Sequence, residues 1–216
     1  GMVDTMMVSS AGEAAVSGVA LVDMVNYLII TVMAALTTGG AVVISQYLGR
    51  EQPERAAFSA GQLAMVSALL STGIMALGLV LRQGILRLFF GAVEPPVMEA
   101  ALTYFVITAC SFPFLGIYNA GAALYRVLGR TSVTMYISLG MNLINLLGDY
   151  IGVHVLQAGV AGVAVPTLLS RAFAAVVMTV LAFRPGKAVR LRWSHIFAWD
   201  AGEIRRLLHI AVPGGV

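Results

Sequence analysis

Long apolar runs separated by short charged segments dominate the pattern of this chain. Residues 24–49, 56–81 and 100–125 contain no Asp, Glu, Lys or Arg, and each run exceeds the roughly 20 residues that a helix needs to cross a bilayer. The runs 131–148 and 150–170 are shorter and also lack these charges. The alternation of apolar and polar residues that marks β-barrel strands is missing, so the pattern predicts membrane-spanning helices.

Breaks in this pattern divide the chain into elements. We expect helices at about residues 13–47, 56–81, 98–124, 131–153 and 160–183. Pro113 falls near the middle of the third of these helices and Pro166 interrupts the last. Residues 1–8 are apolar but too short to span, and we interpret them as the end of a helix whose beginning is missing. The predicted fold class is an all-α integral membrane protein, a six-helix transmembrane bundle with a truncated first helix.

The character of the chain changes after the last apolar run. Residues 184–201 are basic and aromatic, and they predict a cytoplasmic linker. Residues 202–216 begin as an amphipathic helix that suits the membrane–water interface, and we expect a seventh helix and a second lobe to start there. The predicted domains are therefore a transmembrane lobe over 1–183, the linker, and the start of the second lobe.

Composition and charge agree with a membrane protein and give it an orientation. The chain has 216 residues, of which 59% are hydrophobic and 11% charged, with a net charge of +3. The basic residues gather in alternate loops, so they indicate topology rather than a nucleic-acid partner. The loops predicted to be cytoplasmic hold Arg50, Arg55, Arg126, Arg130, Arg184, Lys187, Arg190, Arg192, Arg205 and Arg206. The opposite loops hold only Arg82 and Arg87.

Three polar residues interrupt the apolar run at 131–153. Asn142, Asn145 and Asp149 have the spacing i, i+3, i+7, which places them on one side of a helix. A carboxylate at the centre of a bilayer costs roughly 3 kcal/mol or more, so it normally faces a partner or a water-filled cavity. We interpret this side of the helix as a cation-binding surface of a transporter.

Other polar residues extend the candidate site. Asp4 is expected on the same outer side of the membrane as Asp149, Asp23 lies in the next predicted helix, and Thr167 follows Pro166. Carboxylate, amide and hydroxyl oxygens suit a hard cation such as Na⁺, and burial favours a carboxylate that carries a proton. The alternative is structural, because buried amides can simply join helices by hydrogen bonds, and Ala158 with Gly162 is a small-residue pair that lets helices approach.

Several segments resemble the multidrug and toxic compound extrusion (MATE) family. Residues 1–8 resemble the end of its first helix, and the segments Gln46-Tyr47-Leu48-Gly49-Arg50 and Arg126-Val127-Leu128-Gly129-Arg130 resemble its loops. Asn145 with Asp149, followed by Thr167, resembles the cation site of its N-terminal lobe. The resemblance implies that Asp4, Asn145, Asp149 and Thr167 bind the coupling ion, with Asn142 and Asp23 as accessory residues.

The resemblance also implies a function. Members of that family consist of two six-helix lobes and export drugs or other organic cations against inward Na⁺ or H⁺, so this chain would be one lobe in a bacterial inner membrane. No cofactor beyond the coupling ion, no nucleic-acid partner and no enzymatic chemistry is expected. Two alternatives stay open: a flippase for lipid-linked saccharides, for which Arg171 is the only phosphate-binding candidate within the helices, and a non-transport membrane scaffold.

Overall fold

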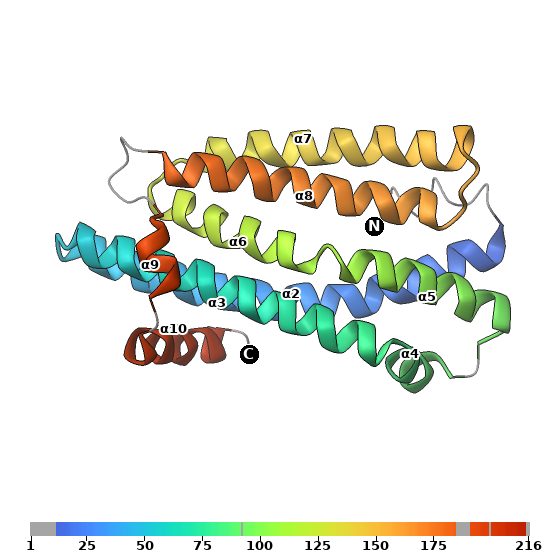
Figure 1. The fold of residues 1–216 in the computed structure, drawn as a ribbon, viewed down its shortest axis with the longest axis horizontal. Helices are drawn as coiled ribbons and strands as arrows, with labels where there is room; N and C mark the ends of the chain where they lie inside the picture. The colour runs from blue at the N-terminus through green and yellow to red at the C-terminus, as the bar shows by residue number, and fades with distance from the viewer. Residues whose placement is uncertain (1–11, 92, 185–190, 199, 215–216) are drawn as a thin grey trace. The chain divides into compact units, whose positions relative to one another are not determined.

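The computed structural model describes residues 12–91, 93–184, 191–198 and 200–214. Every regular element in these residues is helical, as the sequence predicts (Figure 1). The elements are α2 (Glu13–Gly49), α3 (Pro53–Val80), α4 (Arg82–Phe90), α5 (Pro95–Ala109), α6 (Phe112–Val127), α7 (Thr131–Tyr150), the π-helix η2 (Ile151–Val155), α8 (Ala161–Phe183), α9 (Trp193–Phe197) and α10 (Ala201–Gly214).

The chain divides into two compact units, and several of the long helices contribute residues to both. Unit 1 comprises Gly1–Ile29, Thr72–Phe112 and Leu139–Phe173, and unit 2 comprises Ile30–Ser71, Pro113–Ser138 and Ala174–Val216. The described basic residues that the sequence assigns to the cytoplasm all belong to unit 2, whereas Arg82 and Arg87 belong to unit 1. The two sets of basic loops in the sequence therefore fall in different units. The domain boundaries at 184 and 202 stay predictions.

The core of unit 1 joins α2 to α5. Val19 and Val22 of α2 are fully buried, and they belong to one apolar cluster with Tyr104 and Phe105 of α5. A Cβ atom at Gly18 would lie 2.8 Å from the Cβ of Ala100, so only glycine permits this approach of the two helices. The same cluster includes Leu86 of the short helix α4.

The core of unit 2 unites the ends of four helices with the linker. Ile44 of α2, Leu63 of α3, Leu124 of α6 and Ala182 of α8 are all fully buried in one apolar cluster. Leu207 of α10 is also fully buried there. Leu191 of the predicted linker is buried in the same cluster, so the linker also packs into the core of the helices that precede it.

Two helices that the sequence did not predict complete the structure. The α4 helix lies in the connection that the sequence interprets as a loop, and α9 is a single short helix within the linker. The predicted helix 98–124 is instead a pair, α5 and α6, bent by 45° at the break between Ala109 and Phe112, with Pro113 in the first turn of α6. Proline lacks the N–H that would continue the hydrogen-bonding of α5, but it fits the first turn of a new helix.

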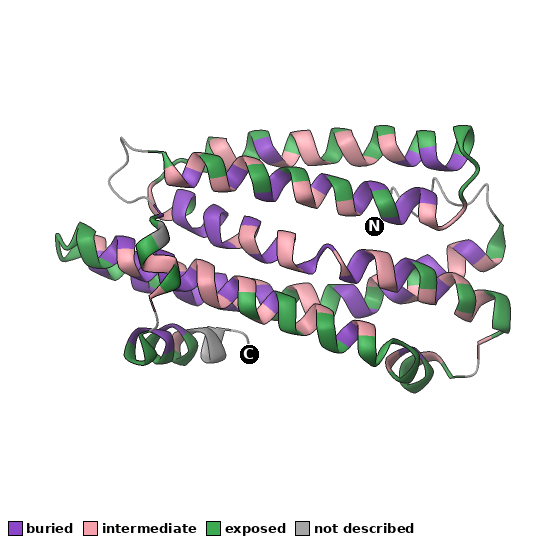
Figure 2. Cartoon of the chain, in the orientation of Figure 1, coloured by how far each residue is buried: buried purple, intermediate pink, exposed green. Residues whose placement is uncertain are grey.

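Length and hydropathy make three helices of the described chain candidates for crossing a membrane, namely α2, α3 and α8, or four if α5 and α6 form one broken span. The predicted span at α7 is not among them, because its amide and hydroxyl residues lower its hydropathy. Figure 2 shows exposed residues along the length of α7. Large apolar side chains such as Leu139, Leu143 and Leu147 lie on this exposed side.

Candidate functional site

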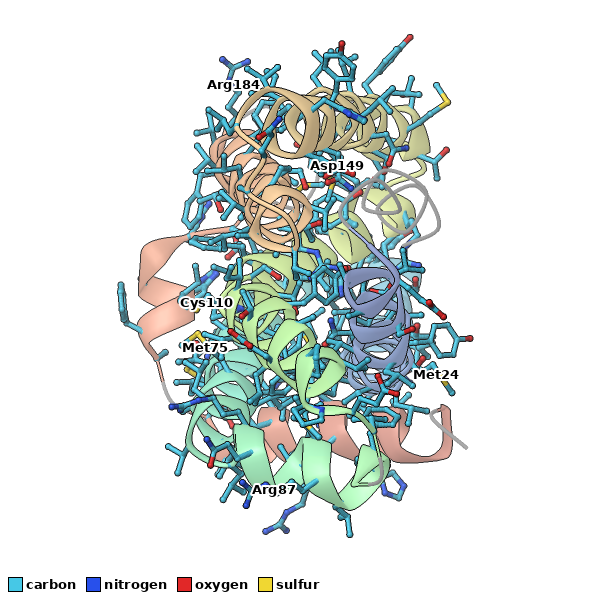
Figure 3. All side chains as sticks on the ribbon, turned by 90° about the vertical axis from the view of Figure 1, so that its right-hand side faces the viewer. Met24, Met75, Arg87, Cys110, Asp149 and Arg184 are labelled. Carbon is cyan, nitrogen blue, oxygen red and sulfur yellow. The ribbon has the colours of Figure 1, made fainter. Side chains whose placement is uncertain are left out.

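The candidate site is built around Asp149, near the end of α7 in unit 1. Its side chain has no exposed surface. Figure 3 shows Asp149 among the helices, whereas the side chain of Met24 lies at the periphery of the same unit. A fully buried carboxylate on an otherwise apolar helix is expensive, and such residues in membrane proteins mark ion or proton pathways. The burial of Asp149 makes it the central group of the site.

Two glycines bring α7 and η2 against α8. A Cβ atom at Gly148 would lie 2.6 Å from the Cβ of Pro166, and one at Gly152 would lie 2.3 Å from the carbonyl oxygen of Gly162. Real side chains do not tolerate such distances, so the two backbones approach closely only because glycine stands at both positions. Of the predicted small-residue pair, Gly162 lies in this contact and packs against Gly152, whereas Ala158 lies before the start of α8.

This close approach brings Asn145 and Thr167 together. The hydroxyl of Thr167 lies 3.3 Å from Oδ1 of Asn145 and 3.1 Å from the carbonyl oxygen of Val163, one turn earlier in α8. Asn145 precedes Asp149 by one helical turn, so it lies on the same side of α7. The structure thus unites two of the predicted residues in one contact, on the side of α7 that carries the buried carboxylate.

The remaining predicted residues have different surroundings. Asn142 is exposed on α7. It lies further round the helix from Gly148 and Gly152, which face α8, than Asn145 does, and this is consistent with its exposure. Asp23 is half-buried and accepts a hydrogen bond of 2.9 Å from the hydroxyl of Tyr104 on α5. Asp4 lies outside the described residues.

Further polar contacts in unit 1 were not anticipated from the sequence. Asn26 of α2 donates a hydrogen bond of 3.0 Å to the hydroxyl of Thr108 on α5. Arg171 of α8, which snorkelling would carry to the cytoplasmic side, instead donates a hydrogen bond of 2.6 Å to Ser111, between α5 and α6. Single hydroxyls in apolar helices carry no sequence signal, because most of them bond to their own backbone.

The chemistry available to this site is oxygen coordination and proton exchange. The Thr167 hydroxyl oxygen and Oδ1 of Asn145 are 3.3 Å apart. Both can lie about 2.4 Å from one cation, with an oxygen–cation–oxygen angle of about 90°, as oxygen ligands of hard cations do. Asn145, Thr167 and Asp149 supply an amide, a hydroxyl and a carboxylate oxygen. Oxygen ligands of these kinds suit hard cations.

The fold contains several helices that are long and apolar enough to cross a membrane, and it places a buried carboxylate on the same helix as the amide that contacts Thr167. The sequence model of the MatE family matches residues 1–151. The chain therefore belongs to the MATE family of transporters, as its sequence segments indicate.

Relatives agree with this assignment. The chain is 27% identical, over 99% of its own length, to the uncharacterized transporter YisQ of Bacillus subtilis. It is 26% identical, over 85% of its length, to the probable multidrug resistance protein NorM of Thermotoga maritima. It spans 47% and 40%, respectively, of these relatives, about half of their length.

Solved structures share the fold. A MATE transporter in the bent conformation matches with a TM-score of 0.92 and 22% identity, over 99% of this chain and 47% of that one. The inward-facing conformation of a multidrug resistance MATE family transporter matches with a TM-score of 0.90 and 23% identity, over 99% and 48% of the two chains. These likenesses confirm the predicted all-helical fold, and the chain spans about half the length of each of these solved chains.

Proposed function

We propose that this chain is the N-terminal lobe of an ion-coupled exporter of organic, cationic compounds, and that the coupling ion, Na⁺ or H⁺, binds at Asp149, Asn145 and Thr167. In this proposal Asp4 is a further carboxylate ligand of the ion, and Asn142 and Asp23 are accessory residues. The observation that carries the proposal is the complete burial of Asp149 beside the contact of Asn145 with Thr167.

The Thr167 hydroxyl has one hydrogen, and its acceptors include Oδ1 of Asn145 and the carbonyl oxygen of Val163. When this hydrogen is donated to the carbonyl oxygen of Val163, lone pairs of Thr167 and Asn145 are available to the same cation. Asp149 then supplies the negative charge that a buried cation requires, since an uncompensated charge in an apolar interior is strongly disfavoured. With H⁺ as the coupling ion, Asp149 alone carries the charge change, and the amide and hydroxyl position it.

The ion can drive transport only if it binds one conformation better than another. Neutralising Asp149 removes the cost of a buried charge, and this favours the arrangement in which α7 and α8 pack most closely. Pro166 removes one backbone hydrogen bond from α8 beside Gly148, so α8 has a natural place to bend. In this proposal, closure of this lobe around the ion reduces the space for the organic substrate and releases it outside.

The test is efflux by the whole transporter in vesicles, driven by an imposed Na⁺ gradient or an imposed pH gradient. Asp149→Asn keeps the size of the side chain and removes its charge, so we expect gradient-driven efflux to be abolished with normal amounts of protein. Thr167→Val removes one oxygen, and we expect the ion concentration for half-maximal efflux to rise about tenfold or more. Glu99→Gln, at an exposed position of α5, is the control and should transport normally. Undiminished efflux by Asp149→Asn would refute the site.

A further inference from the structure

Unit 2 contains an apolar cavity that the proposed transport cycle does not use. Its volume is about 260 Å³, and it lies between α3, α6 and α8 beneath the linker helix α9. Its wall includes Ala68, Gly121, Met178 and Phe183, and linker residues Leu191 and Phe197 close it. Thr179 is the one polar residue of the described lining, and its hydroxyl donates to the carbonyl oxygen of Ala175 in its own helix at 2.7 Å. The cavity therefore suits a hydrocarbon group.

The linker above the cavity is fastened at several points. The side-chain amide of Gln62 on α3 donates hydrogen bonds to the carbonyl oxygens of His195 at 2.7 Å and Ala198 at 2.5 Å. The backbone N–H of Leu191 donates to the carbonyl oxygen of Ala182 at 3.0 Å. These hydrogen bonds fix the linker on both sides of α9. The linker therefore lies over the cavity, and the small residues of the wall leave space beneath it.

An arginine comes directly after each of two residues that line the cavity. Phe183 and Leu191 line the cavity, and each is followed directly by an exposed arginine, Arg184 and Arg192. Residues 184–192 also include Lys187 and Arg190 in the sequence, immediately after the candidate membrane span α8. Clusters of Lys and Arg at this position attract anionic lipid, each residue contributing about 1 kcal/mol near a membrane surface.

We propose that this cavity is the binding site for one acyl chain of an anionic phospholipid, whose phosphate is held by Arg184 and Arg192. Two of the helices that form its wall, α3 and α8, are long and apolar enough to lie among lipid chains. A cationic transport substrate fits this cavity poorly, because none of the described residues that line it carries a charge to pair with the cation. This inference is independent of the ion site at Asp149, which lies in unit 1.

The experiment uses phosphatidylglycerol and phosphatidylcholine that carry the same light-activated group at the end of one acyl chain. The whole transporter is reconstituted in vesicles containing either probe, irradiated, and digested for mass spectrometry. We expect labelling of peptides that contain Met178 or Phe197, with phosphatidylglycerol labelling them more strongly. In the double variant Arg184→Gln, Arg192→Gln, the ratio of labelling by phosphatidylglycerol to labelling by phosphatidylcholine should fall roughly 10- to 30-fold.

One further variant tests the cavity itself, and two variants serve as controls. Ala68→Phe fills the cavity and should suppress the labelling, whereas Ala76→Phe makes the same change at an exposed position of the same helix and should not. Arg87→Gln, exposed on α4, should leave the lipid preference intact. Equal labelling by both lipids, or a preference that survives in the double arginine variant, would overturn the proposal. Loss of the label on adding an organic cation, but not on adding unlabelled phosphatidylglycerol, would assign the cavity to substrate and also overturn it.

Discussion

At the scale of single residues, the contact of α7 and η2 with α8 depends on the absence of side chains. Gly152 faces the backbone of Gly162, and Gly148 faces the rigid ring of Pro166. Neither neighbour can turn aside as a flexible side chain could. The distance between Asn145 and Thr167 is therefore a consequence of two glycines that are themselves unable to bind an ion.

We expect Gly152→Ala to destabilise the protein by about 1–3 kcal/mol, because the added methyl group meets backbone and forces the helices apart. The same variant should weaken ion binding, since it separates Asn145 from Thr167. Gly73→Ala is the control: Gly73 lies inside α3 with no neighbouring atom within 4 Å of the added carbon, and the change should stabilise by roughly 0.5–1 kcal/mol. Thermal denaturation of the two variants measures these opposite changes in stability. Equal melting temperatures for Gly152→Ala and Gly73→Ala would contradict this account.

At the scale of elements, the linker is held against α2 and α3 by polar contacts as well as by apolar packing. Gln62 is fully buried, and its amide oxygen also accepts a hydrogen bond of 3.3 Å from the backbone N–H of Asp200. Gly61 makes room for His195, because a Cβ atom at Gly61 would lie 2.5 Å from that of His195. A single side chain of α3 thus holds both the end of α9 and the residue before α10.

Replacing Gln62 by Leu should release the linker. The change leaves the carbonyl oxygens of His195 and Ala198 without their donor, at a cost of about 1–3 kcal/mol for each buried group left unsatisfied. Both tryptophans of the chain, Trp193 and Trp199, fall in the linker sequence, so tryptophan emission during heating reports on this segment. We expect earlier melting by this signal for Gln62→Leu and no change for Gln83→Leu, at an exposed position of α4.

The α10 helix carries a buried carboxylate of its own. Glu203 accepts hydrogen bonds from the Tyr47 hydroxyl at 3.1 Å and from Arg206 at 3.4 Å. The guanidinium groups of Arg55 and Arg206 each lie 5.7 Å from the centre of the Tyr47 ring. Burial raises the pKa of Glu203 above its ordinary value of 4.5, and Asp200 raises it further, whereas Ser59 and Arg55 act in the opposite direction.

A raised pKa means that the folded state binds this proton more tightly than the unfolded state does. The contribution of Glu203 to stability is therefore present at pH values below 4.5 and is lost as pH rises through the raised pKa. We expect α10 and the linker before it to unfold at higher temperature as pH falls from neutral toward this range, and Glu203→Gln to reduce that dependence. Glu54→Gln, exposed at the start of α3, should retain it. An identical pH dependence in Glu203→Gln would show that another group is responsible.

At the scale of the whole molecule, this chain matches about half of each relative. Transporters of this kind move substrate by rocking one repeat against another around a fixed site. The exposed apolar side of α7, with Leu139, Leu143 and Leu147, is a surface that lipid or a second lobe would cover. A single lobe has nothing to rock against, even with an intact ion site.

We therefore expect the 216-residue chain, purified alone and reconstituted in liposomes, to bind the coupling ion without exporting an organic cation. The whole transporter, measured in the same liposomes, should export it. Ion binding is followed by the shift in melting temperature with Na⁺ concentration or pH, and export by the loss of a fluorescent cation. Gradient-driven export by the single lobe would contradict a two-lobe mechanism.

The sequence by itself determined the fold class, most helices and the family. Uninterrupted apolar runs can satisfy their backbone groups in a membrane only as helices or closed barrels, and these runs lack the barrel alternation. Asp149 could be singled out for the same reason, because a carboxylate in such a run is costly wherever the helix packs. The described basic residues of the loops predicted to be cytoplasmic all fall in unit 2, but nothing in the sequence indicated the two units themselves.

Only the tertiary structure decided which polar residues meet. Spacing places Asn142, Asn145 and Asp149 on one side of a helix, but the glycines at 148 and 152 set the direction from which α8 approaches, and this direction favours Asn145 over Asn142. The partners of Asp23, Arg171 and Gln62 lie 60 or more positions away along the chain. Local periodicity holds no information on such pairs, because they depend on how helices distant in sequence pack together.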